Sequence, residues 1–491
     1  MHVPTQPSPS NGPRRILIVS PDTFGRKMGG PAIRAWEMAK RLSAVTEVRL
    51  VSIREASLSN DDFEVLAVDG DELRRQVEWA DVVIAQGEVF ALNPWLAETD
   101  VVIVADVYDP LHLEVLESAK DETPEGRSFL TKYCVDMLTT QLRRADFVMC
   151  ASEKQRDFWL GHLGAIERIN PAVYDADHSL RTLIDVVPFG VSDDVPSQTR
   201  HGIRGAVDGI GPDDKIILWG GGVYNWFDPL TLIRAVRQLS QSHPEVKLYF
   251  LGMTYPNAAV QDSKMAAQAL SLSEELGLTD THVFFNMGWT DYDDRINYLL
   301  DADVGVSTHF SHVETALSFR TRILDYLWAG LPIVATDGDG FAPLIRDNNL
   351  GEVVAAEDVD ALAAALERTL FNSDTEKLRA NVRAFGERYQ WDVALEPLIR
   401  FCVDPKRAAD HPTSGVDPLE VGRVQHIEML EAKTLELDRQ LGTVRDRLGA
   451  VRDKLVSTRD ELDSVRESTS WRLSAPVRIV GRLRSRVRRG R

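Results

Sequence analysis

The chain has 491 residues, of which 44% are hydrophobic and 27% charged, a composition typical of folded proteins and not of disordered or collagen-like ones. At roughly 150 residues per domain, this length predicts two or three domains with extensions. The formal net charge of -19 argues against nucleic-acid binding, because phosphate neutralisation needs a basic surface.

Two further features narrow the class of protein. The three cysteines lie far apart without metal-ligand spacing, which argues against a disulfide scaffold and indicates a reducing cytoplasm. The polar, Pro- and Ser-rich segment 1–13 has no apolar signal-peptide core and predicts a disordered lead. No later window approaches the roughly 20 apolar residues of a spanning helix, so we expect neither secretion nor membrane integration.

Short β-branched apolar runs alternate with helical patterns in two successive series. The first series, in residues 14–200, predicts a parallel sheet covered by helices on both faces, and residues 201–383 repeat the pattern. We therefore predict an α/β protein with two facing, doubly wound Rossmann-like domains. The runs are RILIVS, VRLVSI, DVVIAQG, VVIVADV, FVMCAS and DVVPFGV in the first series, then KIILWGG, VKLYFLG, HVFFNMG, DVGVST, IVATD and GEVVAA in the second.

After the second series the pattern changes to helix and then to a break. Apolar side chains at helical spacing in residues 384–403 predict a return helix that packs on the first domain. The Pro-, Gly- and Asp-rich stretch within residues 404–423 predicts a linker.

Residues 424–467 keep apolar side chains and two threonines at strict 3-4 spacing over more than five heptads, with charges at most other positions. This pattern predicts a coiled coil, and with it a homo-oligomer. A single amphipathic helix lying on the globular body is the alternative.

The last segment, residues 468–491, places Trp471 and several Leu and Val residues at near-helical spacing against arginines. Residues 472–491 hold eight arginines and no acid. Such a basic amphipathic tail suits an anionic membrane surface. A solvated basic terminus and a nucleic-acid contact are the alternatives, and Pro476 interrupts the helix near its start.

Two glycine-rich turns each lead from the first strand of a domain into a helix. Backbone N–H groups at such a turn, together with the helix amino terminus, suit a phosphate, although ordinary tight turns are the alternative. Neither turn matches the dinucleotide fingerprint or the P-loop. Ligands of doubly wound folds bind at these sheet edges, so we predict a diphosphate nucleotide between the domains. The candidate residues are Gly29 and Gly30 in the first turn, and Gly221, Gly222, Asn225 and Trp226 in the second.

The stretch from residue 312 to 340 carries the densest set of candidate side chains. Arg322 and Asp325 are three apart on a predicted helix and so share a face, close to Arg320. A guanidinium can clamp phosphate oxygens while a carboxylate accepts ribose hydroxyls. A surface ion pair of about 0.5 kcal/mol or less is the alternative.

With Glu314, Arg322 and Asp325 followed by AGLP and IVATD, this stretch resembles the donor-binding region of the retaining GT-B glycosyltransferases of the family 4 type. The resemblance runs from about residue 14 to residue 402 and includes the amino-terminal Gly-Gly loop, the VVPFGVSDD junction and the Trp391 segment. It implies a GT-B fold and transfer of a sugar.

The resemblance also implies roles for single residues. Asp325 takes the ribose contact, and Glu314 a catalytic contact with the donor sugar, although Leu317 departs from the family's Glu-x7-Glu motif. The family's Arg and Lys after the first strand of the second domain are replaced by the GGGVYNW loop, so Arg322 and Arg320 would supply that charge.

In the first domain, Asp109 and His112 follow the strand VVIVA and are expected to point toward the cleft. His112 resembles the family's histidine that contacts the donor sugar, which implies a catalytic role. A capping or core histidine is the alternative.

The sequence thus predicts an enzyme that moves a hexosyl group from a nucleoside diphosphate sugar to a hydroxyl of a glycan or lipid-linked acceptor. The family implies retention, and the tail suggests cell-envelope polysaccharide or lipopolysaccharide assembly at the inner face of the cell membrane. We expect no cofactor besides this co-substrate and no metal, because the DGDG at 337–340 lacks supporting ligands. A sugar-nucleotide epimerase and a non-catalytic scaffold are the alternatives.

Overall fold

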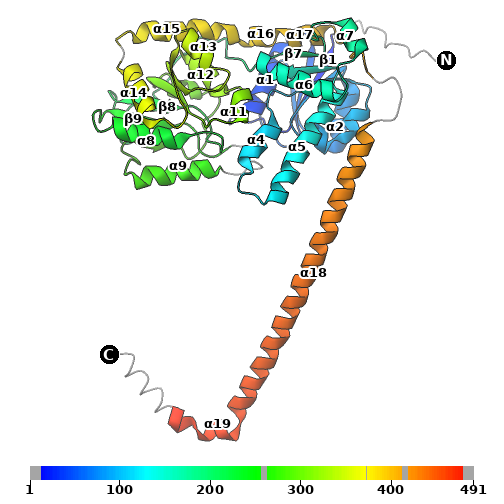
Figure 1. The fold of residues 1–491 in the computed structure, drawn as a ribbon, viewed down its shortest axis with the longest axis vertical. Helices are drawn as coiled ribbons and strands as arrows, with labels where there is room; N and C mark the ends of the chain where they lie inside the picture. The colour runs from blue at the N-terminus through cyan, green and yellow to red at the C-terminus, as the bar shows by residue number, and fades with distance from the viewer. Residues whose placement is uncertain (1–12, 256–262, 372, 412–417, 479–491) are drawn as a thin grey trace, which may run out of the picture. The chain divides into compact units, whose positions relative to one another are not determined.

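The computed structural model describes residues 13–255, 263–371, 373–411 and 418–478. The chain divides into two compact units, Met1–Thr413 and Ser414–Arg491. The first unit contains two α/β domains next to each other, each with a central sheet between layers of helices (Figure 1). The predicted fold class of two Rossmann-like domains is confirmed.

The amino-terminal domain has a seven-stranded parallel sheet in the order β3-β2-β1-β4-β5-β6-β7. Its strands are β1 (Arg15–Ser20), β2 (Glu47–Ser52), β3 (Glu64–Ala67), β4 (Val82–Gln86), β5 (Val102–Asp106), β6 (Phe147–Cys150) and β7 (Ile184–Val186), and its helices α1 (Gly30–Leu42), α2 (Gly70–Trp79), α3 (Val89–Leu92), η1 (Pro94–Glu98), α4 (Leu111–Ser118), α5 (Pro124–Arg144), α6 (Glu153–Ala165) and α7 (Pro171–Ala176). The sequence missed β3, an edge strand that pairs only with β2 and is half-exposed, so it lacks a fully apolar run.

The second domain has a six-stranded parallel sheet in the order β10-β9-β8-β11-β12-β13, one strand for each predicted run. Its strands are β8 (Lys215–Trp219), β9 (Val246–Phe250), β10 (Val283–Phe285), β11 (Val304–Ser307), β12 (Ile333–Thr336) and β13 (Gly351–Val354), and its helices α8 (Pro229–Leu239), α9 (Lys264–Glu275), α10 (Arg295–Leu299), α11 (Val313–Leu317), α12 (Thr321–Ala329), α13 (Ala342–Asp347) and α14 (Val359–Leu370). Both sheets therefore follow from the apolar runs of the sequence.

The strands are apolar throughout because helices cover both faces of each sheet. Along β1, Ile16 and Ile18 join one core cluster, whereas Leu17 and Val19 join another. This alternation follows from the two-residue period of a strand. Each buried aliphatic side chain contributes roughly 1.5–3 kcal/mol relative to exposure, so the sheets anchor the loops at their carboxyl edges.

The return segment packs on the first domain, but it is not one helix. It consists of α15 (Thr375–Gly386), η2 (Glu387–Tyr389), α16 (Trp391–Ala394) and α17 (Glu396–Val403). Gln390 takes an extended conformation and forms a bridge with Val191, which breaks the helix there. A Cβ built on Gly190 would lie 2.5 Å from the Trp391 ring, so only glycine lets this ring approach the domain junction.

The stretch predicted as a linker is partly ordered against the first unit and partly helical. Arg407 and Ala408 bond to Asp146, and Arg168 pairs with Asp410 at 2.8 Å. The long helix α18 (Pro418–Glu467) begins inside the predicted linker. The sequence analysis predicted neither the contacts of residues 407–410 nor the start of α18 at Pro418. A high Pro and Gly content indicates a loop and does not reveal tertiary contacts.

In the second unit, α18 is a continuous helix of 50 residues, and α19 (Thr469–Leu473) follows it. The apolar seam of α18 is exposed, with Leu448 at 70%. The seam is therefore available for a partner helix, and the coiled coil stays a prediction. Most of the predicted basic tail, residues 479–491, lies outside the described residues.

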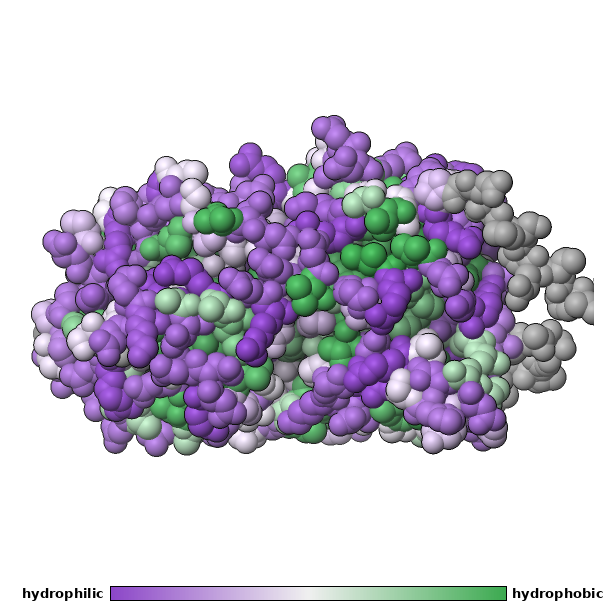
Figure 2. Space-filling model, turned by 90° about the horizontal axis from the view of Figure 1, so that it is seen from above, coloured by the Kyte–Doolittle hydropathy of each residue, from purple (hydrophilic) through white to green (hydrophobic). Residues whose placement is uncertain are grey.

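The face of the first unit that carries α15 and α17 is covered mainly by hydrophilic residues with separate hydrophobic patches between them (Figure 2). Among the described residues, no helix combines the length and the apolar character needed to span a bilayer.

Candidate functional site

Two cavities meet between the domains. A larger cavity of about 690 Å³ is lined mainly by the amino-terminal domain, and a smaller one of about 360 Å³ mainly by the second domain. They share lining residues, among them Tyr108, Asp109, Glu114, Tyr224 and Tyr255. Both volumes suit small-molecule ligands, whose pockets span roughly 300–1,000 Å³.

The two glycine turns lie at the smaller cavity. Gly30, Gly221 and Gly222 line it, and Gly221 has a φ of 103°, a conformation that favours glycine. Gly29 precedes α1, and a Cβ built on it would lie 1.7 Å from the Tyr255 hydroxyl. The backbone of the first turn therefore lies against Tyr255 of the second domain.

Arg322, at the start of α12, lines the smaller cavity and is 7% exposed. Its Nη2 donates to the carbonyl oxygen of Gly222 at 2.8 Å, and its Nη1 is buried without a hydrogen-bond partner among the described residues. The guanidinium lies over the rings of Phe227 and Trp219, at 3.9 and 4.4 Å. Burial lowers the pKa of Arg322 to about 10, and no carboxylate among the described residues forms an ion pair with it.

Arg320 also lines the smaller cavity. Glu314 is not among the described residues that line it, but it contacts Arg320. The Arg320 guanidinium donates to both Glu314 oxygens at 3.0 and 2.8 Å, and Glu314 is 1% exposed. A bidentate pair of this kind fixes the orientation of an arginine. Contact of Glu314 with a donor sugar therefore stays a prediction, whereas its contact with Arg320 is observed.

Asp325 lines the smaller cavity but does not pair with Arg322. Its carboxylate accepts from Nε of Arg295 at 3.1 Å, and the Arg295 guanidinium lies over the rings of Tyr292 and Trp328. Helix spacing suggested that Asp325 lies beside Arg322, but in the structure Asp325 pairs with Arg295, because α10 packs against α12. Asp325 keeps a side-chain exposure of 36%, so it is open to a ligand hydroxyl.

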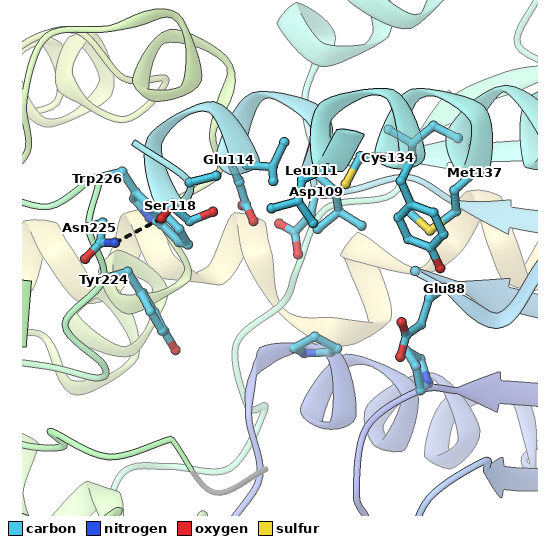
Figure 3. A pocket seen from close by; sticks show the side chains of 18 of the residues that line it. Glu88, Asp109, Leu111, Glu114, Ser118, Cys134, Met137, Tyr224, Asn225 and Trp226 are labelled. Carbon is cyan, nitrogen blue, oxygen red and sulfur yellow. Dashed lines mark hydrogen bonds between the residues drawn. The ribbon is translucent and has the colours of Figure 1, made fainter. Parts of the chain in front are cut away.

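Asp109 lies where the two cavities meet, as does Glu114 on α4. Burial, followed by the nearby charge of Asp106, raises the pKa of Asp109 to about 7. Burial and the charges of Asp109 and Glu314 raise the pKa of Glu114 well above its usual range. In Figure 3 both carboxyl groups point into the same space.

The structure places His112 away from the position expected for it. Its ring stacks on Phe158 with a centroid distance of 5.5 Å and lies 5.8 Å from the ring of Trp159. His112 is not among the described residues that line either cavity. Burial against these rings lowers its pKa to about 4, so the imidazole is neutral. Its contact with a donor sugar stays a prediction.

Asn225 and Trp226, in the loop after β8, lie where the domains meet. Asn225 donates to the carbonyl oxygen of Ser118 at the end of α4, at 3.4 Å, and accepts from Ser263 (Figure 3). Trp226 stacks on Tyr224, with ring centroids 5.0 Å apart, and lines both cavities. The loop therefore connects the two domains as well as lining the smaller cavity.

The sequence analysis missed several cavity residues of the second domain, among them Tyr255, Trp289, Tyr292 and Arg295. Tyr255 donates to Asp22 at 3.0 Å, and Trp289 donates through Nε1 to the carbonyl oxygen of Met28 at 3.1 Å. Tyr255 follows β9, Trp289 and Tyr292 follow β10, and Arg295 begins α10, so their place beyond the carboxyl ends of the strands could have indicated them.

The acidic pair at 337–340 does not form a metal site in the described part of the chain. Asp337 pairs with Arg346 at 3.0 Å, and Asp339 lies 3.5 Å from His309, both fully buried. No group of three or more His, Cys, Asp or Glu side chains among the described residues could hold a metal ion. Metal independence stays a prediction.

Comparison with known proteins bears on this geometry. Residues 206–388 match the family model of the glycosyl transferases group 1. The matched segment contains the glycine triplet, Arg320, Arg322 and Asp325, so the smaller cavity takes most of its wall from the part that is similar to this family.

Curated relatives share shorter stretches. A phosphatidyl-myo-inositol mannosyltransferase of Mycobacterium leprae is 37% identical over 87 residues, 17% of this chain and 22% of that protein. A D-inositol 3-phosphate glycosyltransferase of Mycobacterium marinum is 24% identical over 239 residues, 48% of this chain and 46% of that protein. The chain spans less than half the length of these relatives.

Solved structures extend the likeness over both domains. WaaG, a glycosyltransferase involved in lipopolysaccharide biosynthesis, superimposes with a TM-score of 0.56 at 17% identity, covering 80% of this chain and 100% of that one. Anabaena HepE in complex with UDP and glucose gives a TM-score of 0.56 at 15% identity, with the same coverage. The fold of residues forming the two domains is therefore that of GT-B glycosyltransferases.

Proposed function

We propose that this chain is a glycosyltransferase that moves a sugar from a nucleoside diphosphate sugar to an acceptor hydroxyl. The observation that carries the proposal is the buried Arg322 guanidinium, with one nitrogen lacking a partner among the described residues, beside the glycine triplet in the smaller cavity. A buried cation without a carboxylate partner is costly unless an anion binds there. A diphosphate supplies that anion.

In the proposed reaction, the bond between the sugar C1 and the diphosphate oxygen breaks, and a bond between C1 and the acceptor oxygen forms. The acceptor proton leaves with the nucleoside diphosphate. Negative charge grows on the departing diphosphate, so Arg322, Arg320 and the N–H groups of the glycine turn stabilise the transition state. Glu314 holds Arg320 in place, and Asp325 accepts the ribose hydroxyls.

The stereochemistry, the acceptor and the location are finer features of the proposal. Similarity to the glycosyl transferases group 1 family supports retention of the anomeric configuration, which NMR of the product's anomeric coupling tests. The lipopolysaccharide role of WaaG and the basic tail support a glycan or lipid-linked acceptor of the cell envelope. The tail would hold the protein to the inner face of the cell membrane.

Nucleotide binding tests the central proposal. Calorimetry of the full chain against a panel of nucleoside diphosphates, with magnesium or with EDTA, should give a response to one base that does not need metal. Arg322→Ala should weaken that binding by about 10- to 100-fold, because charge-assisted bonds contribute about 1.5–3 kcal/mol. Arg234→Ala, at an exposed position of α8, is the control and should bind as the parent does.

Two results would contradict the proposal. The first is a parent protein that binds no nucleotide of the panel, and the second is unchanged binding by Arg322→Ala combined with Asp325→Ala. Either would favour the scaffold. Conversion of the sugar within the nucleotide, without transfer, would favour the epimerase.

The tail is tested separately, with vesicles of phosphatidylcholine alone or with phosphatidylglycerol. Deletion of residues 468–491 should abolish sedimentation with the anionic vesicles and leave nucleotide binding intact, because lipid attraction depends on the arginines. Equal sedimentation of parent and deleted protein would refute the membrane role.

Self-association is proposed through the exposed seam of α18. Leu448→Asp in the seam should convert the oligomer to monomer in sedimentation equilibrium, because a charge cannot pack among the leucines of a coiled coil. Asp446→Asn, two positions away and outside the seam, is the control. A parent protein that is monomeric in this experiment would refute self-association through α18.

A further inference from the structure

The apolar seam of the long helix α18 is uncovered in this chain. Its apolar side chains from Ile427 to Val465 are exposed, most of them by half or more. A helix with an apolar stripe of this length gains its stability in water mainly from packing against a partner. Because the stripe repeats every seven residues, a second copy of α18 is the partner that matches it. The order of residues along the seam bears on the direction of that copy.

The core positions of the seam are unlike those of a parallel dimer. The a positions of the heptad are every seventh residue from Ile427 to Leu462, and the d positions every seventh residue from Leu430 to Val465. Parallel dimers favour β-branched residues at a and leucine at d. The middle of this seam has the reverse, with leucine at a and valine at d. These residues are Leu441, Leu448 and Leu455 at a, and Val444 and Val451 at d.

The charges that flank the seam also oppose a parallel pair. In such a pair, each g residue faces the e residue of the next heptad in the partner helix. Arg447 would then face Arg452, and Lys454 would face Arg459, each twice by symmetry. Between residues 427 and 467 these like-charge pairs equal the opposite-charge pairs in number, so the flanks give no net attraction. The opposite-charge pairs are Lys433 with Asp438 and Glu461 with Arg466.

A reversed partner helix changes this balance. When the two seams overlap fully, Ile427 lies beside Val465 of the second copy, g positions face g positions, and e positions face e positions. Three kinds of opposite-charge pair then form, each twice by symmetry. Two like-charge contacts remain at these positions, each formed once, where Arg445 and Arg447 meet their own copies near the twofold axis. The opposite-charge pairs are Glu431 with Arg459, Asp438 with Arg452, and Lys433 with Glu461.

We propose that α18 pairs with α18 of a second copy in antiparallel orientation, overlapping from Ile427 to Val465. This inference rests on the proposed self-association and does not depend on the transfer reaction. In this register Thr434 shares a layer with Thr458 of the second copy, so the two polar seam residues are matched. Sliding the helices by one heptad would place each threonine against an apolar residue. A polar residue in the seam helps to specify register in this way.

The direction of pairing determines which parts of the two chains come together. At 1.5 Å per residue, the 50 residues of α18 separate its amino end from the start of the basic tail by about 75 Å. In an antiparallel pair, the carboxyl end of one α18 lies beside the amino end of the other. The tail of each chain therefore begins next to the linker of its partner, and a membrane-bound tail would anchor the α/β domains of the partner chain.

Disulfide mapping tests the direction in the full chain. Thr434→Cys and Thr458→Cys are co-expressed on separate chains that differ in tag size and carry Cys134→Ser, since the other two cysteines are fully buried. Oxidation should give a linked heterodimer. Each variant alone should give no linked dimer, because the two copies of residue 434 would lie about 36 Å apart along the pair, and a disulfide needs Cα atoms within about 7 Å.

Charge reversal tests the flanks, because one substitution has opposite effects in the two directions. In an antiparallel pair, Arg459→Glu would face Glu431 and should weaken self-association about tenfold in sedimentation equilibrium at low ionic strength. In a parallel pair it would face Lys454 and strengthen self-association instead. Arg439→Glu, the same change at an outer position of the heptad, is the control and should stay within about threefold of the parent. Adding Glu431→Arg to Arg459→Glu should restore the parent affinity.

The outcomes separate the direction of pairing from self-association itself. Linked dimers of Thr434→Cys alone, or tighter association of Arg459→Glu, would overturn the antiparallel pair and leave self-association through α18 in place. A dimeric parent whose two cysteine variants do not link to each other would also overturn it. A monomeric parent would refute self-association and this inference together. Nucleotide binding, which tests the proposed transferase, should be the same in all these variants.

Discussion

The two cavities share Asp109 and Glu114, yet their remaining walls have opposite charge. The smaller cavity is lined by Arg320, just before α12, and by Arg322 in its first turn, and no described carboxylate forms an ion pair with Arg322. The larger cavity is lined by seven carboxylates and by two cations, Arg54 and Lys264, which pair with Glu88 and Asp121. The two sides of the cleft therefore present opposite charge to a ligand.

Tyr255 lines both cavities and lies against Gly29, so Gly29→Ala is expected to give the largest effect. The added Cβ would lie 1.7 Å from the Tyr255 hydroxyl and would displace the ring from both walls. We expect transfer to fall about 100-fold, since displacements of about 1 Å can cost that much. Steady-state kinetics measures it.

Gly25→Ala is the matched control for this change. A Cβ at Gly25 would lie 3.4 Å from the Ser57 hydroxyl and 3.9 Å from the carbonyl oxygen of Lys27, both ordinary contacts. Equal activity of the two variants would show that Tyr255 does not shape the cleft.

Asp325→Ala should separate ribose recognition from diphosphate recognition in the smaller cavity. We expect nucleoside diphosphate binding to weaken about 10-fold or more, because a charged acceptor of hydroxyl bonds is lost. Inorganic pyrophosphate, which lacks the ribose, should bind unchanged in the same calorimetric titration. Asp347→Ala, exposed at the end of α13, is the control, and weakened pyrophosphate binding would assign Asp325 to the phosphates instead.

The pH dependence of stability should distinguish Asp109 from His112. The pKa of Asp109 is raised from 3.8 to about 7, so the folded state binds a proton that the unfolded state releases, and this contribution to stability is lost as pH rises from about 4 to about 7. The pKa of His112 is lowered from 6.5 to about 4, so its effect has the opposite sign and stability increases with pH from about 4 to about 6.5.

Denaturant titrations across this pH range measure both effects. Asp109→Asn should make stability increase more steeply with pH, by at most a few kcal/mol over the window. His112→Phe, which can keep the stack on Phe158, should make the increase flatter. Parallel curves for the parent and both variants would contradict the assigned pKa shifts.

Glu88→Gln should give the smallest effect. Glu88 lines the larger cavity but pairs with Arg54 at 2.8 Å while both side chains remain more than a third exposed. Such pairs contribute about 0–1 kcal/mol, so the free energy of unfolding should fall by about 1 kcal/mol at most, which denaturant titration measures. A clearly larger loss would show that the pair of Glu88 with Arg54 stabilises the fold more than its exposure indicates.

Much of the smaller cavity could be predicted because short-range patterns encode it. The glycine turns, Arg320, Arg322 and Asp325 stand at the carboxyl edges of runs that had to be parallel strands. What helix spacing could not give is the partner of each side chain. Asp325 pairs with Arg295 and Arg320 with Glu314, since these contacts depend on how α10 and α11 pack.

The larger cavity could not be predicted from the sequence, because the pattern of residues in α5 does not show which of them will line a cavity. Leu130, Cys134 and Met137 line the cavity where this helix lies beside α4, and the other lining residues, carboxylates among them, come from segments far apart in the chain. The sequence analysis missed the edge strand β3 and the break in the return segment for a related reason. Strand β3 is held by pairing with β2, and the helix breaks where Gln390 bridges to Val191, and both contacts join residues distant in the chain.

The sequence by itself determined six strands of each sheet, the glycine turns and most of the long helix α18, because apolar periodicity and glycine conformation act over a few residues. Only the tertiary structure decided that His112 stacks on Phe158 and that Asp109 and Glu114 meet at the junction of the cavities. Burial and charge pairing arise from residues distant in the chain, and these set the chemistry of the cleft.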